Sequence, residues 1–324
     1  MAGKPAFVVF IGIVTTIYPK INIFAIDNTP DMDTEDIIYL KNEEINRRKW
    51  DSAVSQSPFN SLFGYSWFLD TVCQTWDALI TYDYRKIMPI PVFDSKNPQM
   101  QQYLMWTGIY GPDIPTRQEA ELFINRIPET YNGLYINLNK LCGIYNVDNG
   151  LIRHDKIYQI DLIQPYKKRR FQTPPTQNKK YAIDIKQCVS FFIANNYKTD
   201  TMMYYRMIKE VKQRGHCMIF ALANPDKIIL GCAVIFMTQT EIYITDLSIN
   251  KNQKEYRTIK NELLDTIISY FSGKNFTIYI KTNKRGLYDS FDTETLDLFD
   301  AQPFTHIYYI RNTMSKFYNF FNIK

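Results

Sequence analysis

The clearest pattern of apolar and polar positions lies between residues 218 and 271. Three runs rich in β-branched and aromatic residues, 218–223, 228–236 and 241–247, are separated by turn-forming or polar residues. A polar, basic loop follows at 248–257, and apolar positions then recur at the spacing of one buried helix face: Ile259, Leu263, Leu264, Ile267, Ile268 and Phe271. This order predicts a hairpin, a third strand, a loop and a helix. The loop lies where the N–H groups of a helix N-terminus can hold an anion.

The same patterns predict elements along the rest of the chain. Strands are expected at 37–40, 76–80, 87–92, 134–138, 154–162, 276–281 and 306–311. Helices are expected at 43–55, 64–73, 117–126, 184–195, 201–214 and, as one short helix, 287–291 with 295–299. The mixture predicts an α+β fold, with sheets that are mostly antiparallel and flanked by helices.

The length of 324 residues favours two domains. We expect an N-terminal domain over 32–175 and a C-terminal domain over 176–324. Both halves offer strand hairpins followed by a helix, which is consistent with a duplicated fold. A content of 45% hydrophobic residues is enough for two cores and argues against disorder.

Residues 1–31 form an apolar extension that admits three interpretations. The run at 6–18 is shorter than the roughly 20 residues that cross a bilayer, only Lys4 precedes it, and no small-residue cleavage site follows. The start could have been assigned too early, with Met32 as the true first residue. The segment could also direct the chain to a membrane, or be an extra packed element. Membrane contact is expected only in the second case.

The net charge of +5 permits a polyanionic partner without requiring one. The stretch 166–180 carries six basic residues and no acidic residue, and the basic segment within it runs from Lys167 to Lys180. A solvated linker at the domain boundary is one interpretation. Contact with RNA phosphates, as in a tRNA, is the other. No partner DNA is expected.

The cysteines and histidines do not predict a metal site. The chain has five cysteines and three histidines with no C-x-x-C pair and no zinc-ligand spacing: Cys73, Cys142, Cys188, Cys217, Cys232, His154, His216 and His306. Reduced thiols in a cytoplasmic protein are expected. The sequence also lacks a phosphate loop, a dinucleotide fingerprint, a zinc-protease motif and a nucleophile elbow.

Four aromatic residues are candidates for a substrate pocket. Most aromatic side chains are core, but a polar-tipped one at a domain cleft can contact substrate. We therefore single out Tyr65 and Trp67, which lie two residues apart in the predicted helix 64–73. Trp106 and Tyr110 accompany two glycines in a loop that is either a tight bend or a close approach to a ligand.

Three passages together resemble the Fem-like branch of the GNAT-like acyl-CoA N-acyltransferase fold, in particular an uncharacterised bacterial subgroup. The first starts the N-terminal domain, the second ends it, and the third is the 218–271 core with its ending at 300–302. The residues that carry the first two are Ile38, Tyr39, Leu40, Trp50, Asp51, Tyr65–Asp70, Trp76–Leu79 and Met88–Pro91, then Tyr158–Leu162 with Pro165 and Tyr166. The resemblance covers roughly residues 36–312.

The resemblance implies two tandem GNAT-like domains and an amide-forming transferase. The donor would be an acyl-CoA or an aminoacyl-tRNA, used as a co-substrate, and the acceptor a small-molecule or peptide amine. The acyl group would lie beside the strand 242–247, where Asp246 would accept the amine proton. The donor phosphates would meet the following loop, and Tyr65, Trp67, Trp106 and Tyr110 would line the acceptor pocket. The expected phosphate contacts are Lys251, Gln253, Lys254, Arg257 and Thr258.

The phosphate loop departs from the GNAT pattern. Enzymes of that family place small residues where this chain has Tyr256 and Thr258. A tyrosine side chain there would obstruct backbone approach to a pyrophosphate, which weakens the reading as a conventional acetyltransferase. A third reading is a binding protein that keeps the fold, has lost catalysis, and holds a glycan, an RNA or a protein.

Overall fold

Two β-sheets carry the fold in the computed structural model, which describes residues 37–59, 61–93, 100, 103–131, 134–138, 151–174, 176–195, 200–250, 252, 255–281 and 293–310. The smaller sheet has the order β1-β2-β3, from the strands Ile37–Leu40, Thr75–Thr81 and Ile87–Val92. Both of its strand pairs are antiparallel. Around it lie α1 (Arg47–Gln56), α2 (Ser66–Val72) and α3 (Arg117–Asn125).

The larger sheet has eight strands in the order β4-β11-β5-β10-β9-β8-β7-β6. Among its described strands, only β9 and β10 run parallel to each other. The strands are β4 (Tyr135–Leu138), β5 (Leu151–Asp161), β6 (Lys179–Lys180), β7 (Cys217–Ala223), β8 (Ile229–Met237), β9 (Glu241–Ile249), β10 (Thr277–Lys281) and β11 (Gln302–Ile310). The chain is thus of mixed α/β class with antiparallel-rich sheets, as the sequence predicted.

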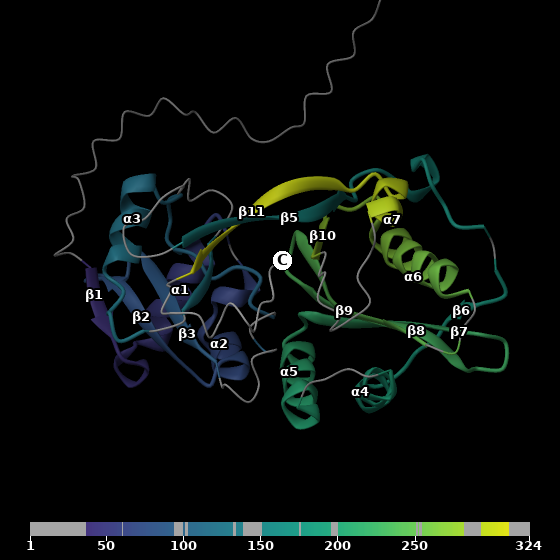
Figure 1. Cartoon of the computed structure of the whole chain (residues 1–324), viewed down its shortest axis with the longest axis horizontal. Coiled ribbons are helices and arrows are strands. Elements are labelled where there is room, and N and C mark those ends of the chain that lie inside the picture. Colours follow the sequence, from purple (N-terminus) through teal and green to yellow (C-terminus); the bar gives the residue numbers. More distant parts are fainter. Residues whose placement is uncertain are drawn as a thin grey trace, which may run out of the picture. The chain divides into compact units, whose positions relative to one another are not determined.

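Helices cover the larger sheet on both faces. α6 (Tyr256–Phe271) lies on one side of β7–β9, and α4 (Ile185–Ala194) and α5 (Thr201–Gln213) lie on the other (Figure 1). α7 (Thr293–Leu298) packs with α6, since Leu296 and Leu264 belong to the same apolar cluster. We call the two faces of the sheet the α6 face and the α4–α5 face.

A separate apolar cluster fills each face. The cluster on the α6 face contains the six apolar residues of α6 that the periodicity singled out, all buried. The cluster on the α4–α5 face also takes in side chains from the first hundred residues. Phe63 meets the ring of Tyr243 with centroids 4.8 Å apart, and Phe68 meets Phe236 at 6.0 Å. The 62–72 stretch therefore packs directly onto the larger sheet.

Side-chain caps explain where several helices begin. Asp184 and Asp200 accept hydrogen bonds from the backbone N–H groups of Gln187 and Met203, which starts α4 and α5. Asn46 likewise caps α1. The predicted helix over 43–55 is therefore interrupted, because a 3-10 turn at Asn42–Glu44 ends before this cap.

Most other predicted elements agree with the structure within a few residues. β11 begins four positions earlier than the predicted strand 306–311, because Gln302 already pairs with Gln159 of β5. The predicted helical stretch 287–291 and the apolar extension 1–31 lie outside the described residues. The boundary between residues 175 and 176 stays a prediction. Strands from both sides of it share the larger sheet.

Candidate active site

The parallel strands β9 and β10 stop pairing well before β9 ends. Their register runs from Glu241 opposite Thr277 to Ile244 opposite Ile280, whereas β9 continues to Ile249. β10 itself ends at Lys281, so among the described residues the second half of β9 has no strand partner on that side. The carboxyl ends of parallel strands are where ligands of such sheets bind. The pairing thus marks a candidate site beside the second half of β9.

A β-bulge re-aims the side chains at this point. Val234 of β8 lies opposite Asp246 and Ile235 lies opposite Ile244, so Thr245 is the extra residue. The hydroxyl of Thr245 donates to the carbonyl oxygen of Val234 at 3.1 Å. Because of the bulge, Asp246 follows Tyr243 onto the α4–α5 face, while Leu247 stays with the cluster under α6.

Asp246, the residue that the resemblance implied as proton acceptor, is only 1% exposed. The hydroxyl of Tyr103 donates to its Oδ1 at 3.0 Å. Tyr204 of α5 lies nearby, and burial together with the charge of Asp246 raises the pKa of the Tyr204 phenol well above its ordinary value. The carboxylate is therefore held among phenol groups and shielded from bulk water.

A second polar pair lies on the same face. The indole N–H of Trp106 donates to the hydroxyl of Tyr243 at 3.1 Å, and that hydroxyl donates to Glu241. Tyr243 also stacks on Tyr279 of β10, with ring centroids 5.4 Å apart. Burial raises the pKa of Tyr243 far above its usual range, so its hydroxyl keeps its proton. These contacts join the loop containing Trp106 to both β9 and β10.

The loop that was expected to hold phosphate is described only in part. Lys251, Gln253 and Lys254 lie outside the described residues. Arg257 is exposed and forms an ion pair with Glu294 of α7 at 2.5 Å, and Thr258 is exposed. The N-cap residue Glu255 makes no side-chain hydrogen bond to the first turn of α6.

Tyr256, which was expected to obstruct a pyrophosphate, is the first residue of α6. Its side chain is half-buried and packs against the apolar cluster of the α6 face. The obstruction stays a prediction.

The four acceptor-pocket candidates fall into two pairs. Trp106 and Tyr110 are buried, and the Tyr110 hydroxyl donates to the carbonyl oxygen of Trp106 at 2.9 Å. The Tyr110 ring lies over Gly64, where an added Cβ would come within 2.5 Å of it. Only hydrogen fits under this ring, so Gly64 allows the close packing.

Tyr65 and Trp67 lie at the start of α2 and are partly exposed. Trp67 stacks on His216 at 6.0 Å between centroids, and the guanidinium of Arg214 lies 4.4 Å from the Trp67 ring centroid. Burial, followed by the charge of Asp51, raises the pKa of Tyr65. An aromatic stack with a cation forms a platform at the surface, whereas the pair Trp106 and Tyr110 belongs to the core.

The sequence did not single out Tyr103, Tyr204 or Tyr243, which surround the candidate site. Tyr243 is flanked by isoleucines, Tyr103 precedes Leu104, and Tyr204 is next to Tyr205; aromatic residues in such positions are usually core. Their hydroxyl groups were the available signal, because a buried phenol needs a polar partner. Three buried thiols share this face, and the Sγ atoms of Cys188 and Cys232 lie 3.6 Å apart.

The basic segment is docked onto α6 by its non-basic residues. Asp265 accepts hydrogen bonds from Tyr166 and Thr173, and Glu262 accepts from Thr176 and Asn178. The basic side chains remain exposed, apart from the half-buried Arg169: Lys167, Lys168, Arg170, Lys179 and Lys180. The segment is thus held in place and still presents its positive charges.

The described residues contain no group of three or more His, Cys, Asp or Glu side chains placed to hold a metal ion. None of the helices described is long and apolar enough to cross a membrane.

Comparisons with known proteins place this geometry in a fold. No family model and no curated protein matches the chain. Among solved structures, FemX is similar with a TM-score of 0.54 at 9% identity, over 86% of this chain and 99% of that one. The C-terminal domain of a protein named as a lysylphosphatidylglycerol synthetase from Agrobacterium fabrum is similar with a TM-score of 0.50 at 9% identity, over 82% and 92%. The described chain has the Fem-like, GNAT-like acyltransferase fold.

Proposed function

We propose that the chain is an N-acyltransferase that forms an amide between an activated acyl or aminoacyl donor and an amine. The observation that carries the proposal is the end of the pairing between β9 and β10 at Ile244, beside the bulge at Thr245. We place the donor along the part of β9 beyond this point. Leu247 and Ser248 are in the part of β9 that β10 does not reach.

The chemistry needs a neutral amine, a polarised carbonyl and a place for the proton. The amine nitrogen attacks the donor carbonyl carbon, and backbone N–H groups of β9 stabilise the oxyanion that forms. The bond to the leaving thiol or ribose hydroxyl then breaks. Asp246 takes the amine proton and the leaving group receives it, so the step is balanced. Tyr103 acts as a positioning residue, through its hydrogen bond to Asp246.

Two donor classes fit this site, an acyl-CoA and an aminoacyl-tRNA. Both carry phosphate groups, for which the first turn of α6, Arg257, Thr258 and the loop residues Lys251, Gln253 and Lys254 are the proposed contacts. The A. fabrum neighbour is named for a product in which a lysyl group is attached to a lipid, and this name supports an aminoacyl donor for the present chain. For a tRNA donor, the exposed cations from Lys167 to Lys180 are the proposed phosphate contacts.

One observation favours a binding protein without catalysis as the second candidate. Arg257 is already paired with Glu294, so a donor phosphate would have to compete with a carboxylate for it. A protein of this kind would keep the fold and the aromatic platform at Trp67 and Arg214. It would bind a partner without joining an acyl group to an amine.

A transfer assay on the full-length chain separates the two candidates. The protein is incubated with acetyl-CoA, a longer acyl-CoA or an aminoacylated tRNA, together with a panel of amino acids and short peptides, and amides are detected by mass spectrometry. Thermal-shift titrations with the same donors, and with bare tRNA, run in parallel at two salt concentrations. Amide formation with any donor supports the transferase. A folded sample that binds a ligand and forms no amide supports the binding protein.

A further inference from the structure

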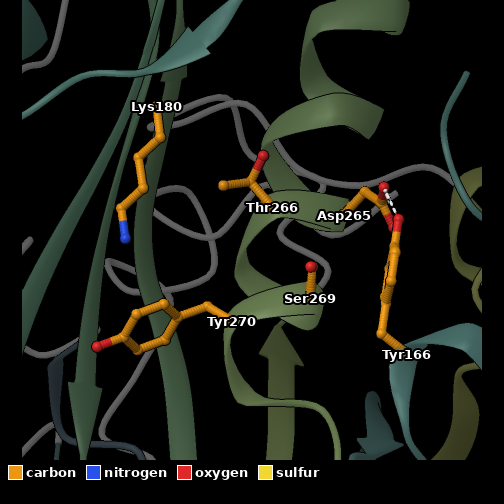
Figure 2. Close-up of a pocket in the computed structure, with 6 residues that line it drawn as sticks. All are labelled: Tyr166, Lys180, Asp265, Thr266, Ser269 and Tyr270. Carbon is orange, nitrogen blue, oxygen red and sulfur yellow. Dashed lines mark hydrogen bonds between the residues drawn. The ribbon is translucent and has the colours of Figure 1, made fainter. Parts of the chain in front are cut away.

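An open cavity of about 290 Å³ lies beside α6, between this helix and β6. Four of its lining residues come from the second half of α6, and the others are Tyr166 and Lys180 (Figure 2). α6 begins at Tyr256, next to the proposed donor loop, whereas the lining residues start at Asp265. The cavity is therefore separate from the donor loop and from Asp246, although Lys180 is also one of the cations proposed above to contact a tRNA donor. Its volume suits a ligand of amino-acid to dipeptide size.

A lysine held by aromatic rings forms one end of the cavity. The ammonium of Lys180 lies 4.3 Å from the ring centroid of Tyr270 and 4.7 Å from that of Phe220. It makes no ion pair with any described residue. The ammonium of Lys274 lies 5.0 Å from the Tyr270 centroid. Since ring faces attract a cation without neutralising it, this end is prepared for an anionic group.

A buried carboxylate forms the other end. Asp265 is 5% exposed, and its Oδ2 accepts from the Tyr166 hydroxyl at 2.5 Å and from Thr173 N and Oγ1 at 3.1 and 2.6 Å. Its Oδ1 is buried and accepts no hydrogen bond from the described residues. Leaving such an oxygen without a donor costs about 1–3 kcal/mol, more when it is charged. This end is therefore suited to a ligand that brings a hydrogen-bond donor.

Hydroxyl groups lie between the two ends. Figure 2 shows Thr266 and Ser269 between Lys180 on one side and Asp265 with Tyr166 on the other. The Thr266 hydroxyl donates to the carbonyl oxygen of Glu262 at 2.7 Å, which leaves its oxygen as an acceptor. Ser269 is exposed and can donate or accept. The cavity thus has a cation, polar neutral groups and an anion in order.

We propose that this cavity binds a small zwitterion, an amino acid or a short peptide. Its carboxylate would lie against Lys180 and its ammonium against Asp265, and the hydroxyls of Thr266 and Ser269 would contact the polar groups between. A simple anion would be repelled by Asp265, and a simple cation by Lys180 and Lys274. Only a ligand that carries both charges complements both ends of the cavity. This binding is a property beyond the proposed acyl transfer.

The test uses the full-length chain and probes that differ in the separation of their charges. L-alanine, γ-aminobutyrate and the dipeptide Ala-Ala are titrated by calorimetry and by ligand-observed NMR, up to about 10 mM. Acetate, ethylamine and inorganic phosphate are the single-charge controls. At least one zwitterion is expected to bind about tenfold or more tightly than any control, because it gains two charge-assisted contacts. Equal binding of zwitterions and controls, or no binding of any zwitterion, would overturn the proposal.

Matched variants place any binding in this cavity. Lys180→Gln should weaken zwitterion binding about tenfold, whereas Lys179→Gln, its exposed neighbour on β6 outside the cavity lining, should leave binding unchanged. Asp265→Asn also removes the anchor of residues 166–173, so Ser269→Ala serves beside it as a milder change that keeps the fold. If neither Lys180→Gln nor Ser269→Ala changes the affinity, the zwitterion binds elsewhere and the assignment fails.

Discussion

The two faces of the eight-stranded sheet are filled in different ways. The α6 face is almost wholly apolar, with side chains from five strands and α6: Ile160, Leu222, Ala233, Ile235, Ile242, Leu247, Ile249, Ile278, Ile280 and the apolar stripe of α6. The α4–α5 face carries thiols, phenols and a carboxylate among its apolar residues, including Cys217, Cys232, Tyr243, Tyr279 and Asp246.

The difference in composition suggests that the α6 face serves stability and the α4–α5 face serves catalysis. The α6 face can be stable through burial of apolar area alone. On the α4–α5 face, a buried polar group is tolerated only with a partner, and the partners come from far along the chain. Tyr103 reaches Asp246, and Trp106 reaches Tyr243. The face that maintains such groups beside the end of the β9–β10 pairing is the one on which we place catalysis.

Loss of the Asp246 carboxylate should have the largest effect on activity. Asp246→Asn keeps the size of the side chain but cannot take a proton, so kcat should fall about 10²–10⁴-fold. The thermal unfolding midpoint should change little by comparison. Asp226→Asn, on the exposed turn before β8, is the matched control and should keep full activity. Equal kcat for both variants would remove Asp246 from the mechanism.

A large-to-small substitution in the core of the α6 face should lower the free energy of unfolding and leave kcat unchanged. Leu263 is fully buried under α6, and Leu263→Ala should cost about 2–5 kcal/mol of unfolding free energy. Chemical denaturation with urea measures the change. Met202→Ala on α5 serves as the control, because Met202 is 58% exposed and its loss should cost far less. A large drop in kcat at temperatures where the Leu263→Ala protein is folded would mean that the faces do not divide these roles.

Removal of one phenol hydroxyl should give a smaller effect on the other face. Tyr103→Phe deletes the donor to Asp246 and should cost about 1 kcal/mol of stability. Its kcat should fall less than that of Asp246→Asn, since the carboxylate remains. Tyr82→Phe is the control, because Tyr82 is 85% exposed. Identical behaviour of the two phenylalanine variants would show that the Tyr103 hydroxyl positions nothing.

The smallest effect concerns Asp77 in the three-stranded sheet. Burial would raise its pKa, but hydrogen bonds from Tyr131, Tyr39, Lys41 and the backbone of Asn42 outweigh burial and lower the pKa below its ordinary value. A carboxyl group with a lowered pKa stabilises the fold above its unfolded pKa, about 3.9, and loses this contribution as the pH falls through the folded value.

The stability difference between the wild type and Asp77→Asn should therefore be constant near neutral pH and shrink below about pH 4. Urea denaturation at several pH values measures it. Asp83→Asn is a poor control, because burial would raise the pKa of Asp83 but hydrogen bonds from Arg85 and Thr81 outweigh it and lower this pKa too. The exposed Asp226 is the better choice. If the stability difference between wild type and Asp77→Asn grew as the pH fell, the charged form of Asp77 would destabilise the fold, and its pKa would be raised and not lowered.

The sequence predicted the α6 face better than the α4–α5 face. Apolar residues that recur every two or every 3.6 positions show which side of a strand or helix is buried. This periodicity predicted β7–β9, β10, and α6 with its buried apolar stripe. The bulge at Thr245 has no such signal, because threonine is an ordinary strand residue. Its consequence, the turn of Asp246 toward Tyr103, could only be seen in three dimensions.

Long-range contacts account for the other omissions. Glu262 and Asp265 occupy the polar side of the helical pattern, yet both are buried because residues 166–178 cover them. β5 lies between β10 and β11, an order that no local pattern encodes. Of the expected phosphate contacts, the structure describes Arg257 and Thr258, and neither is tested by geometry alone.

Hydrogen–deuterium exchange on the full-length chain, with and without the donor that supports transfer, tests the donor position most directly. If the donor lies along β9, peptides covering residues 245–249 and the first turn of α6 should exchange more slowly when it is bound, and β7 should be unaffected. Protection confined to other segments, with β9 unchanged, would show that the donor does not lie along the second half of β9.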